Sequence, residues 1–86
     1  MDRREKRQVA LRFLYDRYEE FGAQPLKIRM PEAAAKTGLS EQDLGMAFQE
    51  LVDDGLAEGH PRPGTGMHPA EGLVWISAAG RRQMER

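Results

Sequence analysis

The amino-acid sequence predicts one small α+β domain over residues 1–86, with a three-helix core, a β-hairpin and a short C-terminal helix. In the first quarter of the chain, apolar residues recur at steps of three and four, which is the spacing of one helix face. Residues 30–60 have the pattern of two helices joined by a tight turn. Two strand-like segments then flank a stretch with three prolines and three glycines, which predicts a loop. A chain of 86 residues has room for only one core.

The first helix is expected over residues 3–21, with Gly22 as its C-terminal cap. Its buried face is predicted to carry Leu11, Leu14, Tyr18 and Phe21. The apolar arc is wider than this face, because it also includes Val9, Ala10, Phe13 and Tyr15. Two interpretations stay open. The helix is either buried on most sides within one chain, or its Val9 and Phe13 side contacts a second copy in a homodimer.

The next elements are a strand and two helices. Residues 26–30 alternate apolar and basic side chains, which predicts a short edge strand. A short helix is expected over 32–37, with Pro31 in its first turn. Gly38 supplies the turn, and Ser40 is the expected N-cap of a helix over 41–54 that Gly55 ends. The inner face of that helix is predicted to consist of Leu44, Ala47, Phe48 and Leu51.

The last third of the chain predicts a hairpin and a helix. Residues 56–58 begin a strand, 59–70 form a loop and 73–76 form the returning strand. Trp75 is expected in the core, because one tryptophan often anchors a domain of this size. Ser77 then caps a final helix over 78–85.

Charge is distributed unevenly along the chain. The whole sequence has a net charge of −1, but residues 30–60 hold one basic residue against seven acidic ones, a net charge of −6. The absence of cysteine excludes disulfides and cysteine-bearing zinc sites. No apolar run approaches the roughly 18–20 residues that span a bilayer, so we expect no membrane partner and a cytoplasmic location.

Three stretches carry a family resemblance. They are Ala-Ala-Lys-Thr-Gly-Leu-Ser at 34–40, Asp-Gly-Leu at 54–56 and Trp-Ile-Ser-Ala-Ala-Gly-Arg-Arg at 75–82. Together with the apolar spacing of the intervening helix, they resemble the winged helix-turn-helix of small bacterial regulators of the multiple-antibiotic-resistance and arsenic-repressor kinds. The resemblance implies a DNA-binding transcriptional regulator, often dimeric. Its second motif helix would enter the major groove, and its wing would reach the minor groove or a phosphate.

By position, the resemblance implies that the groove-facing side chains include Ser40, Gln42, Met46 and Gln49. Gln42 and Gln49 could read adenine edges, or they are solvated helix residues. Arg62, between two prolines, could enter a minor groove from the wing, or it is an ordinary loop arginine. The basic N-terminus could contact phosphates, or it is a solvated helix end; its candidates are Arg3, Arg4, Lys6 and Arg7.

Two functions stay open on these residues. The first is a DNA-binding transcriptional regulator. The second is a protein–protein interaction module that uses the acidic 41–54 helix without binding DNA, because positions such as Met46 and Gln49 often carry cations in DNA-binding relatives. An enzyme is not expected, since the sequence has no glycine-rich phosphate loop and no nucleophile elbow. His60 and His68 do not match a metal-ligand spacing, so no metal or cofactor is expected.

Overall fold

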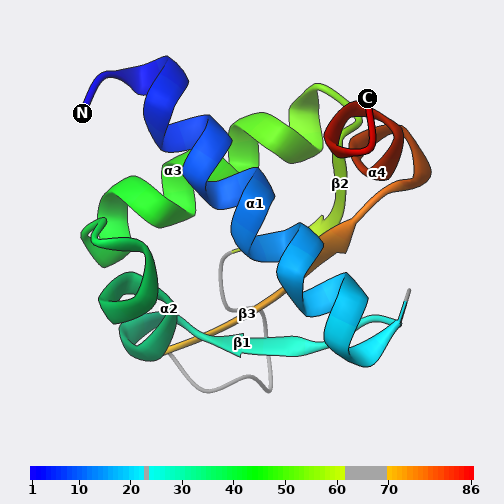
Figure 1. Ribbon diagram of the computed structural model, residues 1–86. Helices are drawn as coiled ribbons and strands as arrows, with labels where there is room; N and C mark the ends of the chain where they lie inside the picture. Colours follow the sequence, from blue (N-terminus) through cyan, green and yellow to red (C-terminus); the bar gives the residue numbers. More distant parts are fainter. Residues whose placement is uncertain (23, 62–69) are drawn as a thin grey trace.

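The computed structural model describes residues 1–22, 24–61 and 70–86, and within these ranges the chain forms four helices and three strands (Figure 1). In chain order the elements are α1 (Arg3–Phe21), β1 (Lys27–Arg29), α2 (Met30–Thr37), α3 (Glu41–Asp53), β2 (Ala57–His60), β3 (Glu71–Ile76) and α4 (Ala78–Met84). The predicted α+β class is confirmed.

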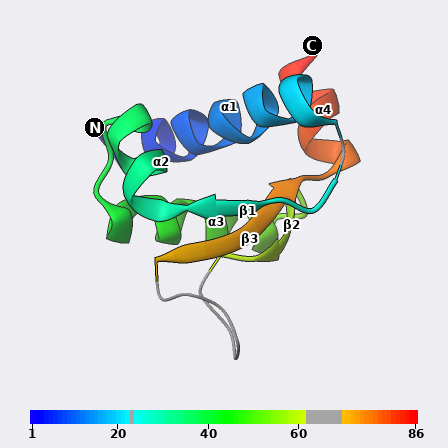
Figure 2. The same cartoon turned by 90° about the horizontal axis from the view of Figure 1, so that it is seen from below.

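The three strands form an antiparallel sheet in the order β1-β3-β2. Lys27 of β1 lies opposite Leu73 of β3, and Glu58 of β2 lies opposite Trp75. Successive side chains of a strand point to opposite faces, and in β3 every second residue is buried. Helix α1 crosses one face of the sheet, with α4 beside one of its ends (Figures 1 and 2).

The core lies where α1, α3 and the sheet meet. Phe48 of α3 is fully buried, and its ring centroid lies 6.1 Å from that of Phe13 on α1. The buried apolar side chains come from every helix except α4 and from all three strands: Ala10, Leu11, Leu14, Ile28, Met30, Ala33, Leu39, Leu44, Ala47, Phe48, Leu51, Ala57, Val74 and Ile76. The predicted inner face of the 41–54 helix is confirmed, because all four of its residues are in this set.

Local interactions fix the end of α2 and the start of α3. Gly38 takes a left-handed conformation with a φ of 76° between α2 and α3, which favours glycine over other residues. The Ser40 hydroxyl accepts a hydrogen bond of 3.0 Å from the Asp43 N–H, so Ser40 is the N-cap of α3 as predicted. The tight turn between the two helices therefore sets the direction in which α3 leaves α2.

Gly80 permits the closest approach of α4 to the rest of the fold. A Cβ at this position would lie 2.1 Å from the carbonyl oxygen of Leu56 and 2.7 Å from Cγ1 of Ile76. The Ser77 hydroxyl caps α4 by accepting from the Gly80 N–H, and it also donates to the Gly55 carbonyl at 2.6 Å. Residues 77–80 thus join the end of the sheet to the loop after α3.

Several predicted boundaries are wrong by one or two residues. The strand expected over 26–30 is shorter, because Met30 already begins α2. Strand β2 extends into the expected 59–70 loop as far as His60, which pairs with Leu73 across the hairpin. Strand β3 begins two residues earlier than predicted, at Glu71, because its first residues pair with β1. Helices α3 and α4 each end one residue earlier than predicted, and the strand expected from residue 56 begins at Ala57.

Two predicted core residues lie elsewhere. Phe21 is 46% exposed at the end of α1, where the guanidinium of Arg17 lies 5.4 Å from its ring centroid. Trp75 is partly exposed, because the alternation of β3 directs its neighbours Val74 and Ile76 into the core. Its indole N–H instead donates to a carboxylate oxygen of Glu58 on the adjacent strand at 2.9 Å.

Candidate functional site

The exposed side of α3 is the surface on which three of the predicted site residues lie, namely Gln42, Met46 and Gln49. We call it the α3 face; it consists of Glu41, Gln42, Gly45, Met46, Gln49 and Asp53. Met46 is 54% exposed, which is unusual for a long apolar side chain with buried helix neighbours such as Ala47 and Phe48. The helical period of 3.6 residues explains why these residues share one side of α3, since positions 42, 46, 49 and 53 are three or four residues apart.

Basic residues at the start of α1 pair with acidic residues of α3 and its C-cap. Lys6 Nζ lies 3.0 Å from Asp43 Oδ2. Arg3 pairs in the same way with Glu50. Arg7 pairs with Asp54, the C-cap of α3. The basic start of α1 and the acidic 30–60 region therefore lie side by side in the fold, where their charges partly neutralise each other.

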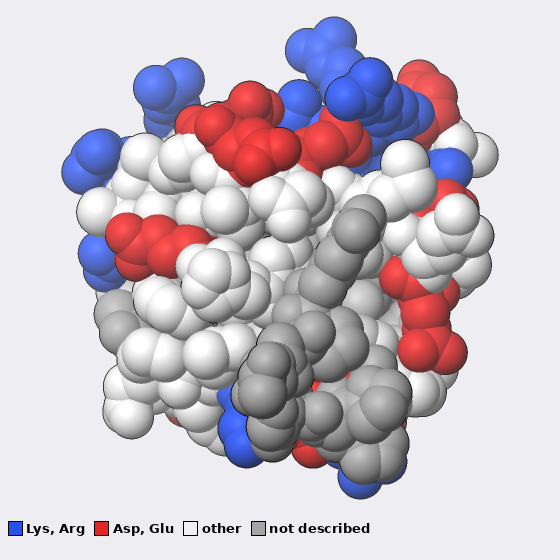
Figure 3. Space-filling view, turned by 180° about the vertical axis from the view of Figure 1, so that it is seen from behind, with Lys and Arg blue, Asp and Glu red and all other residues white. Residues whose placement is uncertain are grey.

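Partial neutralisation leaves an excess of negative charge. Glu41 to Asp54 contains five carboxylates, and the three cations of α1 that pair with them reduce the net charge of this group to −2. Figure 3 shows the side of the molecule on which α3 lies, with red carboxylates directly beside blue basic side chains along its upper edge. Among the residues that Figure 3 does not draw in grey, no cluster of blue basic side chains lies across the middle of this view.

A cleft of about 450 Å³ separates the start of α1 from α3. We call it the α1–α3 cleft. The buried Ala47 and the exposed Met46 supply its apolar surface. Its remaining lining is polar or charged and consists of Arg3, Lys6, Asp43, Gln49 and Glu50. The Arg3–Glu50 and Lys6–Asp43 pairs thus line the same cleft as the two apolar residues.

The structure places the predicted site residues in different roles. Gln42, Met46 and Gln49 share the α3 face, and Gln49 donates to the Asp53 carboxylate at 2.9 Å. Ser40 is engaged as the helix cap. Arg4 is exposed near the start of α1, whereas Arg3 and Arg7 form the ion pairs described above. Arg62 and His68 lie outside the described residues.

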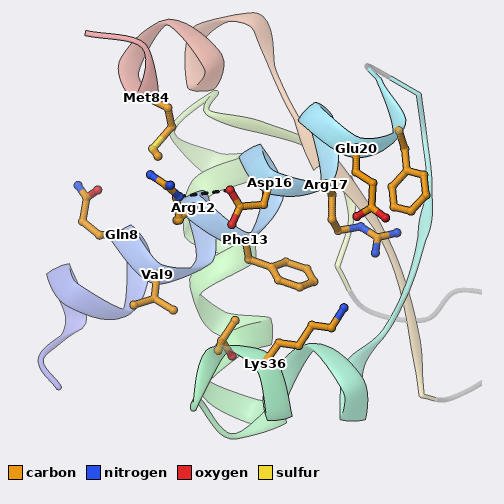
Figure 4. Close-up of a pocket in the computed structure, with 11 residues that line it drawn as sticks. Gln8, Val9, Arg12, Phe13, Asp16, Arg17, Glu20, Lys36 and Met84 are labelled. Atoms are coloured by element: carbon orange, nitrogen blue, oxygen red, sulfur yellow. Dashed lines mark ion pairs between the residues drawn. The ribbon is translucent and has the colours of Figure 1, made fainter.

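A second hollow, of about 720 Å³, lies over α1 between α2 and α4. Figure 4 shows Val9 and Phe13 on α1, with Lys36 of α2 and Met84 of α4 on opposite sides of them. Val9 and Phe13 are partly buried, in agreement with an apolar arc that is wider than the core. This hollow and the α3 face lie on different surfaces of the protein, so the two can be tested separately.

Contacts between α1 and α4 include one titratable group with a shifted pKa. The Tyr15 hydroxyl donates to Glu85 at 3.0 Å. This hydrogen bond raises the pKa of Tyr15 above 10.0, with a smaller contribution from burial. Arg81 donates to the Tyr18 hydroxyl at 3.1 Å and lies 4.8 Å from its ring centroid. The sequence offered no signal for these contacts, because their partners lie more than 60 positions apart.

The chain was compared with known proteins at three levels. No family model, no curated protein and no solved structure matches it. The interpretation of the α3 face therefore depends on its own residues. Within the described parts of the chain, no helix is both long enough and apolar enough to cross a bilayer.

Proposed function

We propose that this protein is a protein-binding module that uses its α3 face, within a fold of the winged-helix type. The observation that carries the proposal is the pairing of the α1 cations with the α3 carboxylates. Met46 is exposed beside these pairs and lines the α1–α3 cleft together with Ala47. A flexible thioether adapts to different partner surfaces and is common at protein-binding sites.

The same pairing opposes DNA binding through this surface. Double-stranded DNA carries about one negative charge per 1.7 Å, and binding requires cations that replace its counterions. Arg3 and Arg7, which could contact phosphates, are already paired with Glu50 and Asp54. A duplex that approached α3 would therefore have to displace these carboxylates and would meet a net charge of −2.

The order of the elements favours a second candidate, a DNA-binding transcriptional regulator. Helices α2 and α3 precede a hairpin, and the sheet order β1-β3-β2 is compatible with a winged helix. In this function Gln42, Met46 and Gln49 would face the major groove from α3. Arg4 and Arg62 would supply phosphate or minor-groove contacts, and binding would be weak and only slightly dependent on salt, because few phosphates would be neutralised.

One titration separates the two candidates. A fluorescently labelled random-sequence duplex is titrated with the protein at about 50 mM salt, where phosphate contacts are strong. We expect no change in anisotropy. The matched variant carries Glu41→Lys and Asp53→Lys, which are exposed positions without an ion pair to α1 in the described structure. We expect this variant to gain weak, salt-sensitive binding.

The opposite result would replace the proposal with the regulator. If the unmodified protein binds the duplex, Gln42→Ala and Gln49→Ala locate the contact, since both lie on the α3 face. Weaker binding by these variants would show that α3 enters the groove. Weaker binding by Arg62→Ala alone would place the contact on the segment between β2 and β3.

A further inference from the structure

We infer that the α1–α3 cleft binds a cationic peptide segment that inserts a long apolar side chain beside Met46. The inference depends on the proposed protein-binding function and specifies the chemistry of the partner. It combines two observations. Met46 and Ala47 give the cleft an apolar lining, in which the two cations and two carboxylates balance. The α3 face beside the cleft adds Glu41 and Asp53, two carboxylates that pair with no cation of α1 in the described structure.

The interior of the cleft suits an aliphatic or aromatic side chain. Met46, at 54% exposure, supplies most of its accessible apolar lining, and the almost fully buried Ala47 lies next to it in the helix. The cleft volume of about 450 Å³ lies within the range of roughly 300–1,000 Å³ typical of ligand pockets. Inserting an apolar side chain would remove the Met46 thioether from water, which is favourable in proportion to the apolar area buried.

The surroundings of the cleft select for positive charge on the inserted segment. The Lys6–Asp43 and Arg3–Glu50 pairs line the cleft and are at least partly exposed, and such exposed pairs contribute little to stability. A lysine or arginine of the partner can therefore share these carboxylates without a large loss. Glu41 and Asp53 extend the negative charge along the α3 face beyond the cleft.

The same charges discriminate against other segments. An acidic segment would add negative charge to a group whose net charge is already −2, and like charges in contact weaken association. A cationic segment without an apolar side chain would leave Met46 exposed and would contact only screened surface charges. Both features are therefore required of the partner, and each can be removed separately.

The test uses three synthetic peptides of equal length: one of lysine and leucine, one of glutamate and leucine, and one of lysine and glutamine. Binding to the full-length protein is followed by the NMR signals of the methionine methyl groups. Met84, which lines the hollow over α1, serves as an internal control. We expect only the lysine–leucine peptide to shift the Met46 signal, and the Met84 signal to stay in place.

The variant Met46→Gln removes the apolar contact at an exposed position and should preserve the fold. We expect it to weaken binding of the lysine–leucine peptide at least tenfold. Glu41→Lys combined with Asp53→Lys should also weaken binding of this peptide. Raising the salt concentration should weaken it too, because salt screens the charges. Far-UV circular dichroism confirms that both variants remain folded.

Three outcomes would overturn the inference: no shift at Met46 with any peptide, an equal shift with the glutamate–leucine peptide, or unchanged affinity in Met46→Gln. The second outcome would reject cationic specificity and still support protein binding by the α3 face. Failure of the proposed function is recognised separately, because it requires binding of duplex DNA in the titration described above.

Discussion

Replacing Phe48 with alanine tests the orientation of α3, from which the proposed function follows. Phe48 is fully buried, and its ring lies next to that of Phe13 on α1. Truncation of a buried phenylalanine to alanine costs about 3–5 kcal/mol, because it removes apolar contacts and leaves a cavity. A domain of this length has a total stability of about 4–13 kcal/mol, at roughly 0.05–0.15 kcal/mol per residue. Phe48→Ala is therefore expected to remove a large part of the free energy of unfolding.

The matched control is Met46→Ala, two residues earlier on the same helix. Because Met46 is 54% exposed, its truncation removes little buried area, and we expect a change within about 0.5 kcal/mol. Urea unfolding is followed by circular dichroism and by the fluorescence of Trp75, the one tryptophan of the chain. With a slope of about 1 kcal/mol per molar urea for a small protein, Phe48→Ala should lower the midpoint by about 3 M or more.

Equal effects of the two substitutions would refute the reasoning. If Met46→Ala destabilised the protein as strongly as Phe48→Ala, the side of α3 that we describe as exposed would be buried in the protein in solution. The α3 face would then be unable to bind a partner without unfolding. A loss below about 1 kcal/mol for Phe48→Ala would likewise show that the core lies elsewhere.

Three further predictions concern backbone packing, pH and assembly. Gly45→Ala should stabilise the protein by about 0.5–1 kcal/mol, because its Cβ would meet no atom within 4 Å. Gly80→Ala should destabilise it by about 1–3 kcal/mol, because its Cβ would clash with the Leu56 carbonyl oxygen. Thermal unfolding measures both changes, and a loss of stability in Gly45→Ala would contradict the packing of α3. The hydrogen bond to Glu85 raises the pKa of Tyr15, so its contribution to stability is present below pH 10 and is lost as the pH rises through the raised pKa. Unfolding of Tyr15→Phe should lack this alkaline component, and an unchanged pH profile would argue against the bond. If two copies pair through the hollow over α1, light scattering should give a dimer mass that Val9→Glu reduces to the monomer mass, and a monomer for both proteins would remove the homodimer.

The candidate site was partly predictable from local patterns. The sequence located the helix over 41–54, its N-cap and its buried side, because these depend on residues within a few positions of one another. Met46 was accordingly expected on the outer side, and it is exposed. The partners of Arg3 and Arg7 lie 47 positions away, so no local spacing could indicate them. These pairs change the interpretation of the basic N-terminus from free phosphate contacts to cations that neutralise α3.

Trp75 illustrates the limit of residue type as a guide to burial. A single large aromatic residue suggested a core position, but the two-residue period of β3 reserves the inner side for Val74 and Ile76. Phe21 shows the same limit at the end of a helix, where the apolar period continues after the neighbouring elements have ended. For Phe21 the helical pattern was correct and the extent of the surface that covers it was unknown, whereas the prediction for Trp75 used the residue type and not the period of the strand.

The sequence by itself determined the α+β class, the approximate position of each helix and strand, and the acidic character of the chain between residues 30 and 60. These features follow from periodicity, caps and composition, which act over short stretches of chain. Only the tertiary structure decided that the cations of α1 lie against the carboxylates of α3 and its C-cap, and that a cleft lined in part by Met46 opens between the two helices. The reason is that the packing of helices and sheet around a common core brings distant residues together, and ion pairs depend on distance in space rather than on distance along the chain.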